Sequence, residues 1–194
     1  MTSMLKKMML SLLLGACCAA SHAGVINFDD LSGDFTVSIA AGYQGLNWDN
    51  VGSIRSDAFP GSGYEAGTVS QANAAYNRDG GTVAISKAGA GTFDFVGAFF
   101  TSAWLEQELA FEGYQNGQLI HSTAASFVID TTTPLWVQLD WAAIDTLVIY
   151  NSSGTQWAMD DMVVPEPPSL ALFGAAAVGL LLARRRASGR VNAA

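Results

Sequence analysis

The chain has 194 residues, half of them hydrophobic, with 13% charged residues and a formal net charge of −8. Between residues 24 and 164 the excess of negative charge is larger, since this region has sixteen acidic and three basic residues and a net charge of −13. A region this acidic repels phosphate backbones and anionic lipids, which excludes nucleic acid and anionic membranes as its partners.

The first 23 residues have the three-part pattern of a secretory signal peptide. An apolar run over residues 8–20 follows a pair of lysines, and it is too short to span a membrane. Small residues then lead to a cleavage site between Ala23 and Gly24. We therefore expect residues 1–23 to direct export through the Sec translocon and to be removed by signal peptidase.

The two cysteines of the chain both lie in this leader. Cys17 ends a Leu-Gly-Ala-Cys stretch that also fits a lipoprotein box, so its lipidation is the alternative route of processing. Cleavage after Ala23 removes Cys17 and Cys18 together. The mature protein then has no disulfide, no thiolate nucleophile and no cysteine metal site.

Alternating apolar and polar residues dominate the central region, which is typical of half-buried strands. Residues 93–104 are apolar on both faces around Gly97, which predicts a central strand with a bulge at this glycine. Asn116-Gly117 predicts a hairpin turn, and residues 67–77 predict a loop with a short helical turn. Strands are expected at 25–28, 35–39, 45–51, 83–86, 108–112, 119–129, 135–141, 146–151 and 156–164. Many short strands without a helical period predict an all-β fold, a single β-sandwich of jelly-roll type over residues 24–162.

Residues suited to catalysis are scarce in the region between the two ends. His121 is the one histidine left after signal cleavage, and no nucleophile elbow, zinc helix or phosphate loop is present in the sequence. Glu106, Glu108 and Glu112 share one face of a predicted strand, as a solvated acidic face would. Paired carboxylates also suffice for glycoside hydrolysis. We expect no enzyme here, and a polysaccharide hydrolase is the less favoured alternative.

Two pairs of aspartates stand at the two ends of the predicted sandwich. Asp29 and Asp30 follow the first strand, while Asp160 and Asp161 lie in the last. First and last strands of a jelly roll lie close together, so the four carboxylates would repel one another unless a hard cation such as Ca²⁺ bound between them. This loosely resembles the structural calcium site of jelly-roll carbohydrate-binding modules. The alternative is that these aspartates cap turns and face water.

Tryptophan rings exposed on a sandwich face would suit a polysaccharide ligand. Trp136 shares its predicted face with Gln138 and Asp140, and Trp48 lies among asparagine and aspartate residues, so these two are the candidate glycan-binding rings. Trp104 and Trp141 are expected in the core, because large rings are usually buried.

The last thirty residues combine a proline-rich linker at 163–169, an apolar run and a basic stop. The run from Leu170 to Ala183 extends roughly 21 Å as a helix, short of the ~30 Å bilayer core. Three arginines close it, so residues 170–186 are expected to form a short hydrophobic anchor helix with residues 187–194 in the cytoplasm. The residues that define this pattern are Val164, Pro165, Glu166, Pro167, Arg184, Arg185 and Arg186.

Val-Pro-Glu-Pro, the apolar helix and the arginine triplet closely resemble the PEP-CTERM sorting signal of Gram-negative bacteria. The resemblance implies processing by a membrane-embedded exosortase and an association with exopolysaccharide or biofilm matrix. It implies a membrane-anchored precursor that becomes a surface or matrix protein. We expect a non-catalytic matrix or carbohydrate-binding protein, with a structural or adhesive surface protein as the alternative.

Overall fold

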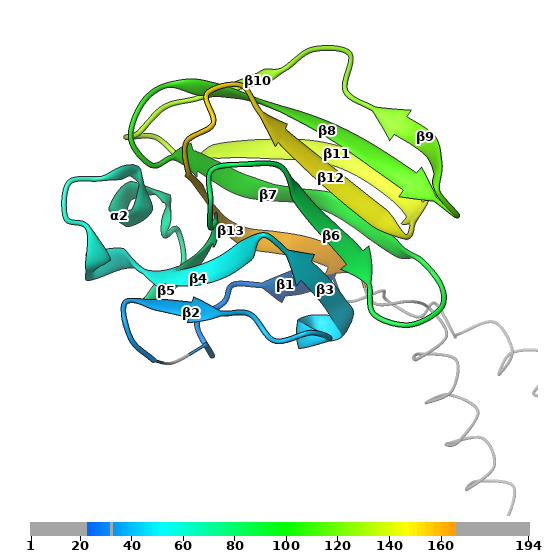
Figure 1. The fold of residues 1–194 in the computed structure, drawn as a ribbon, viewed down its shortest axis with the longest axis horizontal. Helices are drawn as coiled ribbons and strands as arrows, with labels where there is room; N and C mark the ends of the chain where they lie inside the picture. The colour runs from blue at the N-terminus through cyan, green and yellow to red at the C-terminus, as the bar shows by residue number, and fades with distance from the viewer. Residues whose placement is uncertain (1–22, 32, 166–194) are drawn as a thin grey trace, which may run out of the picture. The chain divides into compact units, whose positions relative to one another are not determined.

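The computed structural model describes residues 23–31 and 33–165 of the chain. These residues form two antiparallel sheets and almost no helix (Figure 1). Residues 1–22 of the expected signal peptide 1–23 and the expected anchor helix at 170–186 lie outside the described residues, whereas Ala23 is described as the first residue of a strand. No helix within the described part of the chain is long and apolar enough to cross a membrane.

The first sheet has the strand order β11-β7-β13-β5-β4-β2, and β1 pairs with β13 beside this path. Its strand bounds are β1 Ala23–Ile26, β2 Thr36–Ser38, β4 Val51–Arg55, β5 Asn73–Asn77, β7 Phe93–Ser102, β11 Leu135–Ile144 and β13 Trp157–Pro165.

The second sheet has the order β10-β8-β12-β6-β3, and β9 pairs with β8. Its strand bounds are β3 Leu46–Asp49, β6 Val83–Lys87, β8 Gln107–Gln115, β9 Gln118–Ser122, β10 Phe127–Ile129 and β12 Thr146–Asn151. Three short helical turns complete the described fold: η1 Tyr43–Gly45, η2 Ser56–Ala58 and α2 Gly63–Gly67.

The two sheets pack face to face through the inward side chains of their strands. Phe100 of β7 lies against Phe111 of β8, with ring centroids 5.3 Å apart, and against Trp157 of β13 at 5.6 Å. All three are fully buried in one continuous apolar core. Burial of this kind, at about 25 cal/mol per Å² of apolar surface, is the main force that holds the sheets together. The predicted all-β sandwich class agrees with this arrangement, while its jelly-roll type stays a prediction.

Several strands differ from the expected ones. The stretch 45–51 is two strands, because Asn50 takes a positive φ of 60° and ends β3 before β4 begins. The expected loop at 67–77 contains β5, and the expected single strand at 119–129 is interrupted between β9 and β10. The Asn116-Gly117 hairpin is confirmed, since both residues have positive φ values between β8 and β9.

The predicted bulge at Gly97 is wrong, because the extra residues lie in the strands on either side of β7. Asp140 and Ala143 of β11, and Asp161 of β13, have positive φ values where the register with β7 shifts. Gly97 has another role. A Cβ there would lie 2.4 Å from the Val137 carbonyl oxygen, so only glycine permits this close approach of strands.

The end of the sandwich lies at a later residue than the sequence suggests. The predicted linker begins at Val163, whereas β13 stays paired with β1 as far as Pro165. The last three residues of β13 have extended backbone partners in β1, which is why they belong to the sheet.

Candidate functional site

The structure places Trp48, one of the two predicted glycan-binding rings, inside the protein. Its side chain is 9% exposed and packs edge-on against Phe28 with ring centroids 5.4 Å apart. Its indole N–H donates a hydrogen bond to the Tyr43 carbonyl oxygen at 3.1 Å. The prediction of an exposed ring at this position is wrong, because this face of β3 points into the core.

Trp136, the other predicted ring, is half-buried on the outer face of the first sheet. It meets Phe99 of the neighbouring β7 edge-on, with ring centroids 5.0 Å apart. Further along β11, the Gln138 amide donates a hydrogen bond to the Asp140 carboxylate at 2.7 Å. Glycan binding by Trp136 stays a prediction.

Trp104 is the most exposed of the tryptophans in the described part of the chain, at 49%. It lies in the turn between β7 and β8 and was expected in the core, so this prediction is wrong. The sequence carries a weak signal for exposure, since the ring is the last residue of the apolar run 93–104 and acidic Glu106 follows soon after it. Phe59 and Leu105 beside it are also exposed.

The Trp104 ring is held in place although it faces solvent. Phe59 and Tyr64 contact it nearly at right angles, each with a centroid distance of 5.5 Å. Its indole N–H donates to the Gln156 side-chain oxygen at 3.1 Å. The backbone carbonyl of Gln156 in turn accepts from the Gln107 amide and the Ala103 N–H, both at 3.0 Å. These contacts fix the ring before any ligand arrives, which lowers the entropic cost of binding.

The short helix α2 supplies Tyr64, which packs against the Trp104 ring. The Ser62 hydroxyl caps its first turn by accepting from the Tyr64 N–H at 3.2 Å. Gly63 fits directly over β7, because a Cβ there would lie 1.6 Å from the Ser102 carbonyl oxygen. Tyr64 is thereby buried beneath the surface, and burial raises the pKa of its hydroxyl well above the ordinary value. We call Phe59, Trp104, Leu105 and Gln156 the Trp104 surface.

The residues along the same loops are acidic rather than basic. Glu65 of α2 accepts a hydrogen bond from the Gly61 N–H at 2.6 Å, and Glu106 follows Leu105 in the turn before β8. An anionic ligand would meet like charge here, while a neutral ligand with apolar faces and hydroxyl groups would not.

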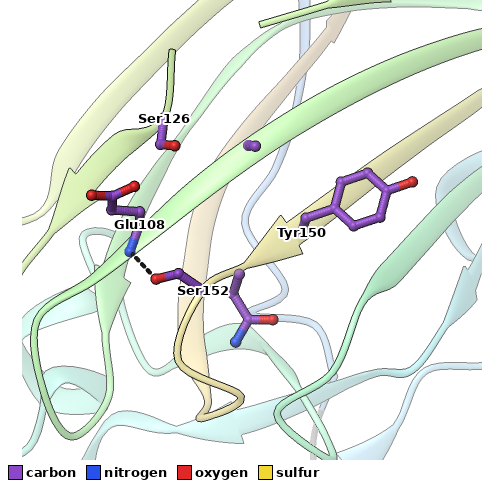
Figure 2. Close-up of a pocket in the computed structure, with 6 residues that line it drawn as sticks. Glu108, Ser126, Tyr150 and Ser152 are labelled. Carbon is purple, nitrogen blue, oxygen red and sulfur yellow. Dashed lines mark hydrogen bonds between the residues drawn. The ribbon is translucent and has the colours of Figure 1, made fainter.

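A shallow pocket of about 160 Å³ lies on the second sheet (Figure 2). Figure 2 shows Glu108 and Ser126 at one end of the pocket and the Tyr150 ring at the other. The Glu108 N–H donates to the Ser152 hydroxyl at 3.0 Å, which ties β8 to the end of β12. Ala110 and Asn151 complete the lining.

Beside this pocket, two tyrosines hold one carboxylate. The hydroxyls of Tyr114 and Tyr150 donate to the same oxygen of Glu112, at 2.5 and 2.8 Å. These hydrogen bonds lower the pKa of Glu112. A general acid for glycoside hydrolysis needs a raised pKa, so the shift of Glu112 runs in the wrong direction for that role.

The predicted neighbourhood of the first and last strands is confirmed, since Ile26 of β1 pairs with Met162 of β13. Asp160 is fully buried, and its carboxylate accepts from the Ser70 N–H at 2.8 Å and from the Ser70 hydroxyl. Burial raises the pKa of Asp160 to about 6. Burial, with the charge of Asp29, also raises the pKa of Asp161.

The other two aspartates have partners of their own. Asp29 accepts from the Asn73 N–H at 3.1 Å, and Asp30 accepts from the Tyr43 hydroxyl at 2.6 Å. In residues 23–31 and 33–165, no three His, Cys, Asp or Glu side chains gather in a group that could hold a metal ion. Calcium binding at these aspartates stays a prediction.

His121 of β9 is half-buried and stacks on Trp141 of β11, with ring centroids 5.3 Å apart and an interplanar angle of 15°. This histidine is engaged with an aromatic ring, and no carboxylate or serine hydrogen bond to it is present among the described residues.

Comparison with known families identifies the tail. Residues 163–186 match the family model of the PEP-CTERM protein-sorting motif. The resemblance of the sequence to this signal is confirmed, and the motif implies an exported protein that an exosortase processes at its C-terminus. No curated protein matches the chain.

Two solved structures that resemble the chain contain carbohydrate-binding modules. TmCBM61 in complex with β-1,4-galactotriose aligns with a TM-score of 0.35 and 10% identity, over 65% of this chain and 94% of that one. The CBM22-1 and GH10 modules of Clostridium thermocellum xylanase 10B with xylohexaose align with a TM-score of 0.25 and 12% identity. That alignment covers 76% of this chain and 28% of the xylanase chain.

Proposed function

We propose that the exported domain is a non-catalytic carbohydrate-binding module, and that the PEP-CTERM tail delivers it to the extracellular or biofilm matrix. The observation that carries the proposal is Trp104, a half-exposed indole fixed by two rings and an amide. A flat, immobile aromatic face suits the apolar face of a pyranose ring, and Gln156 beside it suits a sugar hydroxyl.

The charge of the domain narrows the ligand class. With sixteen acidic and three basic residues between 24 and 164, and with Glu65 and Glu106 on the loops of the Trp104 surface, the ligand is a neutral polysaccharide. Uronic-acid polymers would be repelled. We assign no hydrolytic step to the protein, since the lowered pKa of Glu112 argues against a general acid at the carboxylate that Tyr114 and Tyr150 bind.

Affinity electrophoresis through gels that contain β-1,4-galactan, β-1,4-xylan or alginate tests this proposal. We expect at least one neutral polymer to retard the wild type and alginate to leave its mobility unchanged. Trp104→Ala should weaken the retardation roughly tenfold or more, as removal of an interface anchor does. Trp136→Ala is the matched control, because it removes an indole from another face.

The Gln156→Ala variant probes the fixation of the ring. It keeps Trp104 but removes the hydrogen bond to its indole N–H, so we expect an intermediate loss of retardation. If the Trp104→Ala variant is retarded as strongly as the wild type in every gel, the Trp104 ring has no role in polysaccharide binding. A loss confined to Trp136→Ala would move the site to β11.

The alternative of an adhesive surface protein is favoured by one edge of the second sheet. Leu119 and Ile120 of β9 and Val128 of β10 are exposed on strands that pair only with β8 within the described sheet. Exposed apolar edges pair readily with another strand. Sedimentation velocity of the wild type and Ile120→Lys distinguishes a carbohydrate-binding module from an adhesive protein. A concentration-dependent oligomer of the wild type that dissociates in Ile120→Lys would support the adhesive protein.

A further inference from the structure

The beginning of the sorting motif is part of the folded sandwich. The motif spans residues 163–186, and its first three residues are the end of β13. β1 runs antiparallel beside them in register, with Val25 opposite Val163, Gly24 opposite Val164 and Ala23 opposite Pro165 (Figure 1).

Val163 has a strand on both sides. Its second neighbour is Gly97 of β7, so this residue lies inside the sheet and not at its edge. The approach of β1 to β13 is close, since a Cβ on Gly24 would lie 3.2 Å from the Val164 carbonyl oxygen. The last residue of β1, Ile26, lies opposite Met162 of β13. Both side chains are buried in the core and hold β1 against β13.

Enzymes that cut or transfer peptides commonly bind their substrate as an extended strand, through its backbone N–H and C=O groups. A strand that is already paired has these groups occupied, so it must leave its neighbour before it can enter such a groove. Residues 163–165 stand directly upstream of Glu166 and Pro167 in the motif.

We propose that β1 acts as a clamp on the sorting motif, so that exosortase processing requires β1 to separate from the end of β13. β1 is suited to this because it is four residues long, Ala23 included, and Val25 is 55% exposed, which leaves little apolar burial to hold its outer part. Short edge elements of this kind open locally without global unfolding.

The same ladder includes the predicted signal-peptidase site. Ala23 and Gly24 are both paired residues of β1, so cleavage between them precedes the pairing of β1 with β13. Ala23 leaves with the leader, and the clamp on the mature chain is the pairing of Gly24, Val25 and Ile26 with β13. The clamp thus orders the two processing steps: the leader is removed first, β1 then closes, and the tail is processed during openings of β1.

A disulfide between β1 and β13 tests the clamp directly. Opposite residues of an antiparallel pair have Cα atoms about 4.5–5.5 Å apart, within the range of a disulfide. The substrate is the chain left by leader cleavage, residues 24–194, with Val25→Cys and Val163→Cys, which has no other cysteine. It is oxidised, freed of oxidant and mixed with membranes that contain exosortase, and the intact mass is followed over time.

We expect the locked protein to be processed at least about tenfold more slowly than the wild type, because opening of the ladder is blocked. A reductant should restore the rate, and either single-cysteine variant should behave like the wild type. Processing of the oxidised protein at the wild-type rate would overturn the proposal.

A second variant tests the opposite direction. Val25→Pro removes one N–H from the edge strand and should loosen β1, so that processing becomes faster, while Val25→Thr keeps the backbone and should change little. Slower processing of Val25→Pro, with an unchanged melting temperature, would also contradict the clamp. Both results are independent of polysaccharide binding.

Discussion

Asp160 predicts how the stability of this domain depends on pH. Its carboxylate is fully buried, and burial raises its pKa from 3.8 to about 6, although Ser70 and the Asp161 N–H donate to it. The folded protein therefore binds this proton more tightly than the unfolded chain does. The resulting stabilisation is complete below the unfolded pKa and is lost as the pH rises through about 6.

The size of the effect follows from the two pKa values. Linkage gives about 1.4 kcal/mol more stability at pH 5 than at pH 7, and about 3 kcal/mol once the pH falls below the unfolded pKa. For a domain of this size, the first figure corresponds to a rise in melting temperature of roughly 4–6 °C. Asp161, whose pKa is raised in the same direction, adds to the change.

Thermal melts between pH 5 and 7, in a buffer with chelator, measure this dependence. Asp160→Asn alters the hydrogen bonds to Ser70 and so changes the free energy of unfolding at every pH. Between pH 7 and pH 5, however, the free energy of unfolding of this variant should rise by about 1.4 kcal/mol less than that of the wild type. Asp49→Asn on the exposed edge of β3 removes the same charge and should keep the rise. An equal pH dependence in wild type and Asp160→Asn would refute the reasoning.

Further predictions concern backbone geometry, metal and processing. Gly97→Ala sets a Cβ 2.4 Å from the Val137 carbonyl oxygen and should lower the free energy of unfolding in urea by roughly 1–3 kcal/mol or more. Gly117→Ala, at a φ of 72°, should cost roughly 1–2 kcal/mol in the same assay, and unchanged midpoints would contradict both. Chelation should lower the melting temperature if Ca²⁺ is bound, and Asp161→Ala should remove that effect; identical melts would dispose of the metal. The intact mass of the secreted protein should correspond to a chain that begins at Gly24 and lacks the tail. A mass that matches the untrimmed chain would refute both leader cleavage and tail processing.

Much of the sandwich is readable from local patterns. Strands such as β6, β8 and β12 show strict alternation because one face of each lies on the core, and the β8–β9 turn is readable because Asn-Gly favours positive φ. β5 is not readable in this way. Its residues Asn73–Asn77 are small or polar, and all but Tyr76 are buried, so neither alternation nor an apolar run marks the strand.

The candidate site was less predictable than the fold. Whether a tryptophan is buried depends on which residues pack against it. Tyr64 packs against one side of Trp104, and the ring remains half-exposed to solvent. For Trp48 it is Phe28, twenty residues earlier in the chain. Neither contact is encoded in the spacing of residues around the ring.

By itself, the sequence determined the acidic charge and the sorting motif, and it predicted the export leader, because each is defined by local composition and order along the chain. Only the tertiary structure decided which aromatic ring faces solvent, where Asp160 is buried, and that Pro165 lies opposite Ala23 in a ladder. Those properties arise when residues far apart in the chain meet, such as Tyr64 and Trp104, Ser70 and Asp160, or Ala23 and Pro165, and no local pattern specifies these contacts.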